Sequence, residues 1–130
     1  MTPADIDAQL ASGFHDALIR ELGIDFAEGR ARLVIDFDAG DPDVKDEALR
    51  EAQRRGTLTL TGLQSAIIEP PHPGYSFKET RGGLWVDGDF GAYPGEPAPP
   101  DDGLVRLWFF VQTWNARMVF TAKACGLEWA

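Results

Sequence analysis

The sequence has few of the residues that build most metal and redox centres. Among its 130 residues, one is cysteine and two are histidine. Cys125 therefore has no second thiol in the chain for a disulfide or a CxxC motif, which fits a reducing compartment. We expect Cys125 to be a half-buried structural thiol. The GxGxxG and Walker patterns that bind phosphates are also missing, which argues against a nucleotide-binding loop.

Basic residues and long apolar runs are scarce as well. Lys and Arg number 12 against 21 Asp and Glu, a formal net charge of −9. Without a basic footprint, nucleic acid and anionic membranes are poor partners, whereas a basic protein is a better one. No segment approaches the roughly 20 apolar residues of a membrane helix, and the start, MTPADIDAQLASG, lacks the basic and apolar regions of a signal peptide. These features predict a cytoplasmic protein of bacterial type.

Closely spaced acids in the stretch DFDAGDPDVKDE raise the question of a calcium loop. Asp36, Asp38 and Gly40 fall at positions 1, 3 and 5 of an EF-hand loop, and Glu47 falls at position 12. The sixth position must be glycine for the sharp turn, but it is Asp41. We therefore predict no metal site and no cofactor.

The chain is rich in apolar residues that alternate with polar ones. Ala31, Leu33, Ile35 and Phe37 recur at period two, which is typical of a half-buried strand. The segment 104–114 is apolar on both faces and should be a central strand covered on both sides. Predicted strands cover 18–26, 30–38, 57–68, 82–90, 104–114 and 116–129. Short turns join several of them, so hairpins are expected, with a bulge or close approach at Gly62.

Two short helices and one long loop complete the prediction. Thr2 can cap a helix that has Pro3 at its first position and ends at Gly13. The segment 41–56 reads as a surface helix, or as a long loop that is helical part of the time. The segment 91–103, rich in proline and glycine, is expected to be a surface loop.

These elements indicate an α+β fold that is mostly antiparallel β, with six to seven strands in a curled sheet or sandwich and one or two short helices. A βαβ fold would need a helix between successive strands. Residues 1–130 are expected to form a single domain, and the main variant is a sheet strongly curled around the N-terminal helix.

A ligand site is one hypothesis for the polar residues. The carboxylate of Asp16 could orient the imidazole of His15, but neighbours in an extended strand point to opposite faces, so we expect the two to diverge unless a turn separates them. Asp16 would then close the turn, and His15 would donate to a backbone carbonyl. The functional alternative is a ligand site made by His15, Asp16, Arg106 and Arg117. We predict no catalytic residues.

The tryptophans form a second candidate. Trp85, Trp108 and Trp114 would lie on one sheet face if the strands pair in order, either as core or as an exposed interface. An exposed aromatic face would suit a partner protein.

The outline from FHDALIRELGIDF through LTLTGLQSAII to LWFFVQTWNARMVFTAKACGLEW resembles a group of small uncharacterised bacterial strand-rich proteins, some of which look like immunity proteins of toxin systems. The resemblance implies stoichiometric binding to a toxin, with no catalytic residues.

Together these features favour a non-catalytic, acidic protein-interaction module, with an immunity-like inhibitor of a basic partner as one form. The alternative is a small-molecule binder or enzyme with a pocket near His15 and Asp16. A homodimer is also left open.

Overall fold

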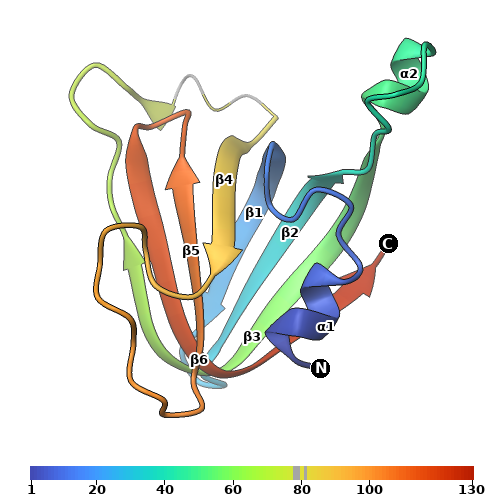
Figure 1. The fold of residues 1–130 in the computed structure, drawn as a ribbon. Coiled ribbons are helices and arrows are strands. Elements are labelled where there is room, and N and C mark those ends of the chain that lie inside the picture. The colour runs from blue at the N-terminus through green and yellow to red at the C-terminus, as the bar shows by residue number, and fades with distance from the viewer. Residues whose placement is uncertain (78–79, 81) are drawn as a thin grey trace.

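The computed structural model describes residues 1–77, 80 and 82–130, and within them six antiparallel strands form a closed barrel in the order β1-β2-β3-β6-β5-β4 (Figure 1). The strands are β1 (Ala17–Asp25), β2 (Arg30–Asp38), β3 (Gln53–Ile68), β4 (Leu84–Phe90), β5 (Val105–Val111) and β6 (Ala116–Trp129). The prediction of an antiparallel, strand-rich chain with few short helices is confirmed. The sheet closes on itself through β1 and β4, so it is a barrel and not a sandwich.

Closure depends on two long strands and on local irregularities. β3 and β6 have 16 and 14 residues and run the length of the barrel (Figure 1). Gly62 has a φ of +60°, and the register between β3 and β6 shifts just after it, between Leu63 and Ser65. A second shift lies in β1 between Ile19 and Glu21. Such bulges bend a strand and increase its twist, which a small barrel needs.

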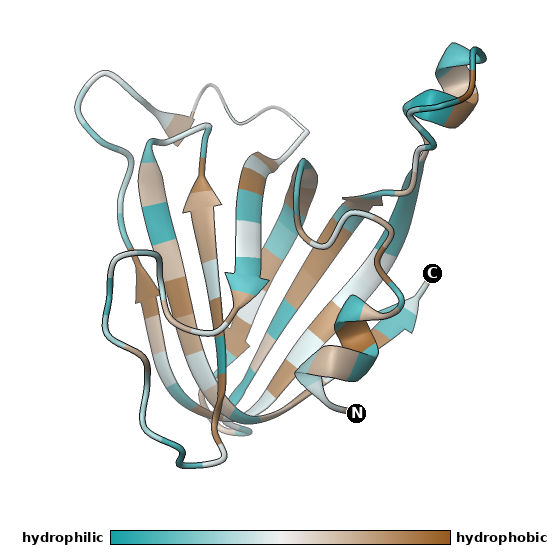
Figure 2. Cartoon of the chain, in the orientation of Figure 1, coloured by the Kyte–Doolittle hydropathy of each residue, from teal (hydrophilic) through white to brown (hydrophobic). Residues whose placement is uncertain are grey.

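The period-two pattern sorts side chains between the inside and the outside. Ala31, Leu33, Ile35 and Phe37 are all fully buried, as their alternation predicts. The same alternation, which Figure 2 shows as bands along the strands, places the other inward residues of the barrel in one apolar core. Side chains therefore fill the barrel interior.

The N-terminal segment adds to this core. Helix α1 (Pro3–Asp7) has Thr2 as its N-cap, as the sequence predicts, and Thr2 and Asp5 also form a reciprocal pair of hydrogen bonds. It ends at Asp7, well before Gly13, and turns follow. Phe14 is buried in those turns and makes edge or tilted contacts with three core phenylalanines, Phe37, Phe90 and Phe109.

Of the two alternatives for 41–56, a surface helix or a loop that is helical part of the time, the full helix is wrong, and the loop with a short helix holds only up to residue 52. Helix α2 (Glu47–Arg50) has four residues, with Asp46 as its N-cap and no buried side chain. β3 already begins at Gln53, which pairs with Asp38 on β2. Backbone pairing with β2 outweighs the weak helical preference of this segment, because its apolar face is too thin to pack.

The loop 91–103 lies on the outer face of β5. The ring of Tyr93 packs edge-on against Trp108, with 5.3 Å between centroids, and Asp102 binds Arg106 through both carboxylate oxygens. β5 therefore has cover on both faces, as its apolar pattern predicts. No helix in the described part of the chain is long and apolar enough to cross a membrane.

Candidate ligand-binding pocket

A pocket of about 880 Å³ opens at the end of the barrel where β4 begins. β1 pairs with β4 over only three residues, Ala17–Ile19 against Leu84–Val86, and beyond the bulge its pairing is with β2 alone. This short seam leaves space beside β1. The apolar part of the lining includes Ile19, Leu22, Leu84, Met118, Phe77 and Trp114. We call this space the end pocket.

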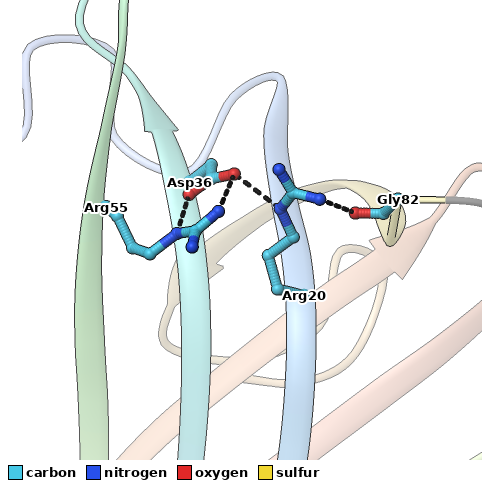
Figure 3. A network of polar contacts seen from close by, with 4 residues as sticks. All are labelled: Arg20, Asp36, Arg55 and Gly82. Atoms are coloured by element: carbon cyan, nitrogen blue, oxygen red, sulfur yellow. Dashed lines mark hydrogen bonds and ion pairs between the residues drawn. The ribbon is translucent and has the colours of Figure 1, made fainter.

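Three charged residues form a network beside the end pocket (Figure 3). Arg55 donates from Nε to Asp36 Oδ1 at 2.7 Å and from Nη2 to Oδ2 at 3.2 Å. Arg20 donates from Nε to Asp36 Oδ2 at 2.7 Å and from Nη1 to the Gly82 carbonyl at 2.8 Å. We refer to Arg20, Asp36 and Arg55 as the arginine triad. Both arginines line the end pocket.

The strand geometry explains how the arginine triad assembles. Asp36 alternates with the buried residues Ile35 and Phe37, so it lies on the outside of β2, directly opposite Arg55 of β3. Arg20 lies within the β1 bulge, two residues after Leu18, which pairs with Asp36. The two guanidinium groups cover the carboxylate, and Asp36 is only 4% exposed although it faces outward.

The contacts favour the ionised forms of Asp36 and Arg55. Hydrogen bonding from Arg55 lowers the pKa of Asp36, burial opposes this, and Arg20 lowers it further. The hydrogen bond that Arg55 donates to Asp36 raises the pKa of Arg55 in turn. Two positive groups and one negative group leave the triad with one net positive charge. Glu21 and Glu69 also line the end pocket, but Glu69 binds Arg117.

Trp114 is a further polar feature of the pocket wall. Its side chain is 5% exposed, and its buried Nε1 has no hydrogen-bond partner among the described residues. Phe77 packs edge-on against its ring, with 4.8 Å between centroids. A buried N–H without an acceptor is uncommon, which marks this position as one where an acceptor would stabilise the structure.

His15 and Asp16 lie together, contrary to the expected divergence. His15 Nε2 is 3.4 Å from Asp16 Oδ2, and His15 Nδ1 is 3.7 Å from Asp87 Oδ1. They belong to the turn before β1, where Asp16 has a φ of +54°, so the rule for extended strands does not apply. Asp16 is the last residue of this turn, and its predicted closing of the turn stays a prediction. The His15 imidazole faces carboxylates instead of a backbone carbonyl, and neither residue lines the end pocket.

Arg106 and Arg117 form ion pairs with residues other than His15 and Asp16. Arg106 pairs with Asp102, and Arg117 pairs with Glu69 and Glu96. Both arginines lie outside the barrel, on β5 and β6, and β4 separates the His15 turn from β5. None of these ion pairs joins either arginine to His15 or Asp16, because sheet order spreads the four residues over several strands, and the four-residue ligand site stays a prediction.

Two of the three tryptophans share a face. Trp85 is exposed on the outside of β4, and Trp108 lies under Tyr93 on the outside of the neighbouring strand β5. Trp114 is buried in the turn between β5 and β6, where strand alternation has ended. The prediction of one face for Trp85, Trp108 and Trp114 is therefore wrong for Trp114, and the use of the other two as an interface stays a prediction.

Sequence reasoning missed the arginine triad as a unit. It considered Asp36 as a calcium ligand, whereas the structure surrounds that carboxylate with guanidinium groups. Among the residues that the structure describes, no group of three His, Cys, Asp or Glu side chains could hold a metal ion. The signal in the sequence that could have pointed to the arginine triad was an acidic residue on the outward-facing side of an alternating strand. Its partners lie 16 and 19 residues away and follow only from the strand register.

Comparison with known proteins supports the fold. No protein-family model matches the sequence, and no curated protein matches it. The chain is similar to a solved structure described as "Crystal structure of an uncharacterized protein from Neisseria gonorrhoeae". The two share 8% sequence identity with a TM-score of 0.53, and the match covers 88% of this chain and 91% of the other. At this identity the likeness concerns the fold alone.

Proposed function

We propose that this protein binds a small, mainly apolar organic molecule in the end pocket. The observation that carries the proposal is a pocket of about 880 Å³ with an apolar wall and a few charged groups. Small-molecule sites typically have volumes of about 300–1,000 Å³ and this mixture of lining groups. They often lie at the mouth of a β-barrel, since the closed wall supplies a rigid frame.

The lining groups are suited to binding. Ile19, Leu84 and Met118 offer apolar surface that excludes water, and Trp114 offers a flat aromatic ring. The arginines are held by Asp36, so they present fixed charges. A pocket whose walls are already positioned loses little entropy when a ligand enters.

The test uses N-phenyl-1-naphthylamine, a neutral dye that fluoresces in apolar surroundings. We expect saturable binding of one dye per chain. Ile68 lines the end pocket and is exposed, so Ile68→Asp should place a charge in the pocket without disrupting the core. Its neighbour Ile67 is similarly exposed but is not part of the lining, so Ile67→Asp is the matched control.

We expect Ile68→Asp to weaken dye binding about tenfold, since a desolvated charge opposes an apolar ligand, and Ile67→Asp to change it less than about twofold. Circular dichroism would verify that both variants keep the strand signal. Equal affinities for the two variants, or no saturable binding by the parent protein, would refute the proposal.

Binding of a basic protein partner is a second candidate. The formal charge of −9 supports it, and five arginines in the described part of the chain already pair with carboxylates. The unpaired acids therefore dominate the outer field, which would steer a basic partner, as in an immunity-like inhibitor. Pull-down from the source cells should recover a basic protein that salt releases; recovery of acidic proteins only, or of none, would count against it.

A further inference from the structure

We propose that the ligand of the end pocket is an amphiphile with one carboxylate, and that Arg20 and Arg55 bind this carboxylate. The inference rests on the proposed function and specifies its ligand class. It follows from the position of the two arginines, their remaining hydrogen-bond donors and the local charge.

The pocket has a polar side and an apolar side. Arg20 and Arg55 come from the outer surface of β1 and β3, whereas Ile19, Leu84 and Met118 border the core. A ligand that fills the space therefore meets guanidinium groups at one end and hydrocarbon at the other. An amphiphile with an apolar body and a polar head matches this division, because each part meets groups of its own kind.

The arginines keep donors that a ligand can use. Arg55 uses Nε and Nη2 on Asp36, and Arg20 uses Nε on Asp36 and Nη1 on Gly82. Within the described residues, this leaves further N–H groups on both guanidinium ions. A planar carboxylate is a good acceptor for such groups, since charged hydrogen bonds are shorter and stronger than neutral ones. Asp36 acts as a positioning residue that holds both donors in place.

The local charge limits the ligand to a single negative charge. The arginine triad carries one net positive charge, but Glu21 in the same lining offsets it, so the free N–H donors of the arginines, and not a net charge, favour the carboxylate. Glu21 also interacts electrostatically with Arg55, so it opposes every anion, and a more highly charged one more strongly. Glu69 is held by Arg117 through its backbone N–H and its side chain. Glu21 is therefore the carboxylate whose removal should improve anion binding.

The experiment measures displacement of bound N-phenyl-1-naphthylamine by decanoate and by 1-decanol, which share a ten-carbon chain and differ in the head group. We expect decanoate to compete at about tenfold lower concentration than 1-decanol, because hydrogen bonds to a charged head group are stronger than those to a hydroxyl group. The preference should shrink as salt is raised, since both arginines are partly exposed to solvent.

Three variants separate the effects of Arg55, of a control arginine and of Glu21 on decanoate binding. Arg55→Gln should reduce decanoate affinity about tenfold and leave 1-decanol within about twofold. Arg32→Gln removes an exposed arginine on β2 that does not line the pocket, and it should change neither. Glu21→Gln should raise decanoate affinity about threefold by removing a like charge. An unfolded variant cannot produce that gain, so the result does not depend on the stability of Arg55→Gln.

The possible results distinguish this inference from the proposed function. If the dye and 1-decanol bind but decanoate has no advantage, or if Arg55→Gln and Arg32→Gln behave alike, the anion inference fails and the pocket remains a site for neutral molecules. An unchanged or weaker decanoate affinity in Glu21→Gln also contradicts it. If the dye shows no saturable binding, the proposed function fails, and the inference fails with it.

Discussion

Replacing Asp36 by asparagine should destabilise the protein by about 2–3 kcal/mol. The side chain is 6% exposed and accepts three hydrogen bonds from charged donors, at 2.7, 2.7 and 3.2 Å. Removing one partner of a buried ion pair typically costs about 3–5 kcal/mol. We take a lower value because the arginine side chains are 38% and 49% exposed and can regain water.

Urea denaturation at pH 7, followed by tryptophan fluorescence, measures this loss. For a chain of this size, about 2–3 kcal/mol lowers the unfolding midpoint by about 1–2 M urea. Asp25→Asn is the matched control, since Asp25 and Arg30 form a longer pair of 3.8 Å with both side chains 46% exposed. We expect it to cost less than about 0.5 kcal/mol. Equal losses for the two variants would show that the triad has no special role in stability.

The pH dependence provides an independent check of the same group. The pKa of Asp36 is lowered in the folded protein, chiefly by the hydrogen bond from Arg55, from an ordinary value of about 3.9. The ionised carboxylate therefore adds stability above about pH 4, and this contribution is lost as pH falls through the folded-state pKa. The unfolding curves of the parent protein and Asp36→Asn should be well separated at pH 7 and approach each other in acid. A separation that stays constant down to pH 2 would contradict the assignment.

Three further outcomes are expected. Trp114→Phe should change the unfolding free energy by less than about 1 kcal/mol, because removal of an N–H without a hydrogen-bond partner among the described residues offsets the lost contacts. A loss above about 3 kcal/mol in urea denaturation would indicate that the Trp114 N–H has a bound acceptor. Gly88→Ala should lower the free energy of unfolding by about 2–3 kcal/mol, because the added Cβ would lie 2.6 Å from the Trp108 carbonyl oxygen. Gly23→Ala is the control, since its Cβ would meet open space and should leave the stability unchanged. Similar melting temperatures for the two variants would argue against this packing. Burial raises the pKa of the Cys125 thiol. Iodoacetamide at pH 8 should therefore alkylate the folded protein far more slowly than the urea-unfolded chain. Equal alkylation rates would contradict the buried position.

Local sequence patterns predicted much of the fold. The alternation of Ala31, Leu33, Ile35 and Phe37 predicted an inward face, and those residues are fully buried. A capped N-terminal helix could also be predicted, because Thr2 acts within three residues of itself. The segment 41–56 could not be assigned correctly, since pairing of β3 with β2 decides where the strand begins.

Most of the candidate site could not be predicted from the sequence. His15 and Asp16 drew attention because they are neighbours in the chain, yet they lie in an exposed turn. Arg20, Asp36 and Arg55 are separated by 16 and 19 residues, and nothing local links them. Their meeting requires the β2–β3 register and the bulge in β1, both of which are properties of the assembled sheet.

The amino-acid sequence by itself determined which residues face inward, where the hairpins turn and that the strands are antiparallel, since these depend on periodicity and short-range turn chemistry. The tertiary structure alone decided that the sheet closes into a barrel, that β1 and β4 share only a three-residue seam, and that a pocket opens beside it. It also decided that Asp36, an outward residue on an ordinary strand, is buried beneath two arginines. Closure, seams and side-chain clusters arise from contacts between distant segments, and these depend on register and curvature that no local pattern encodes.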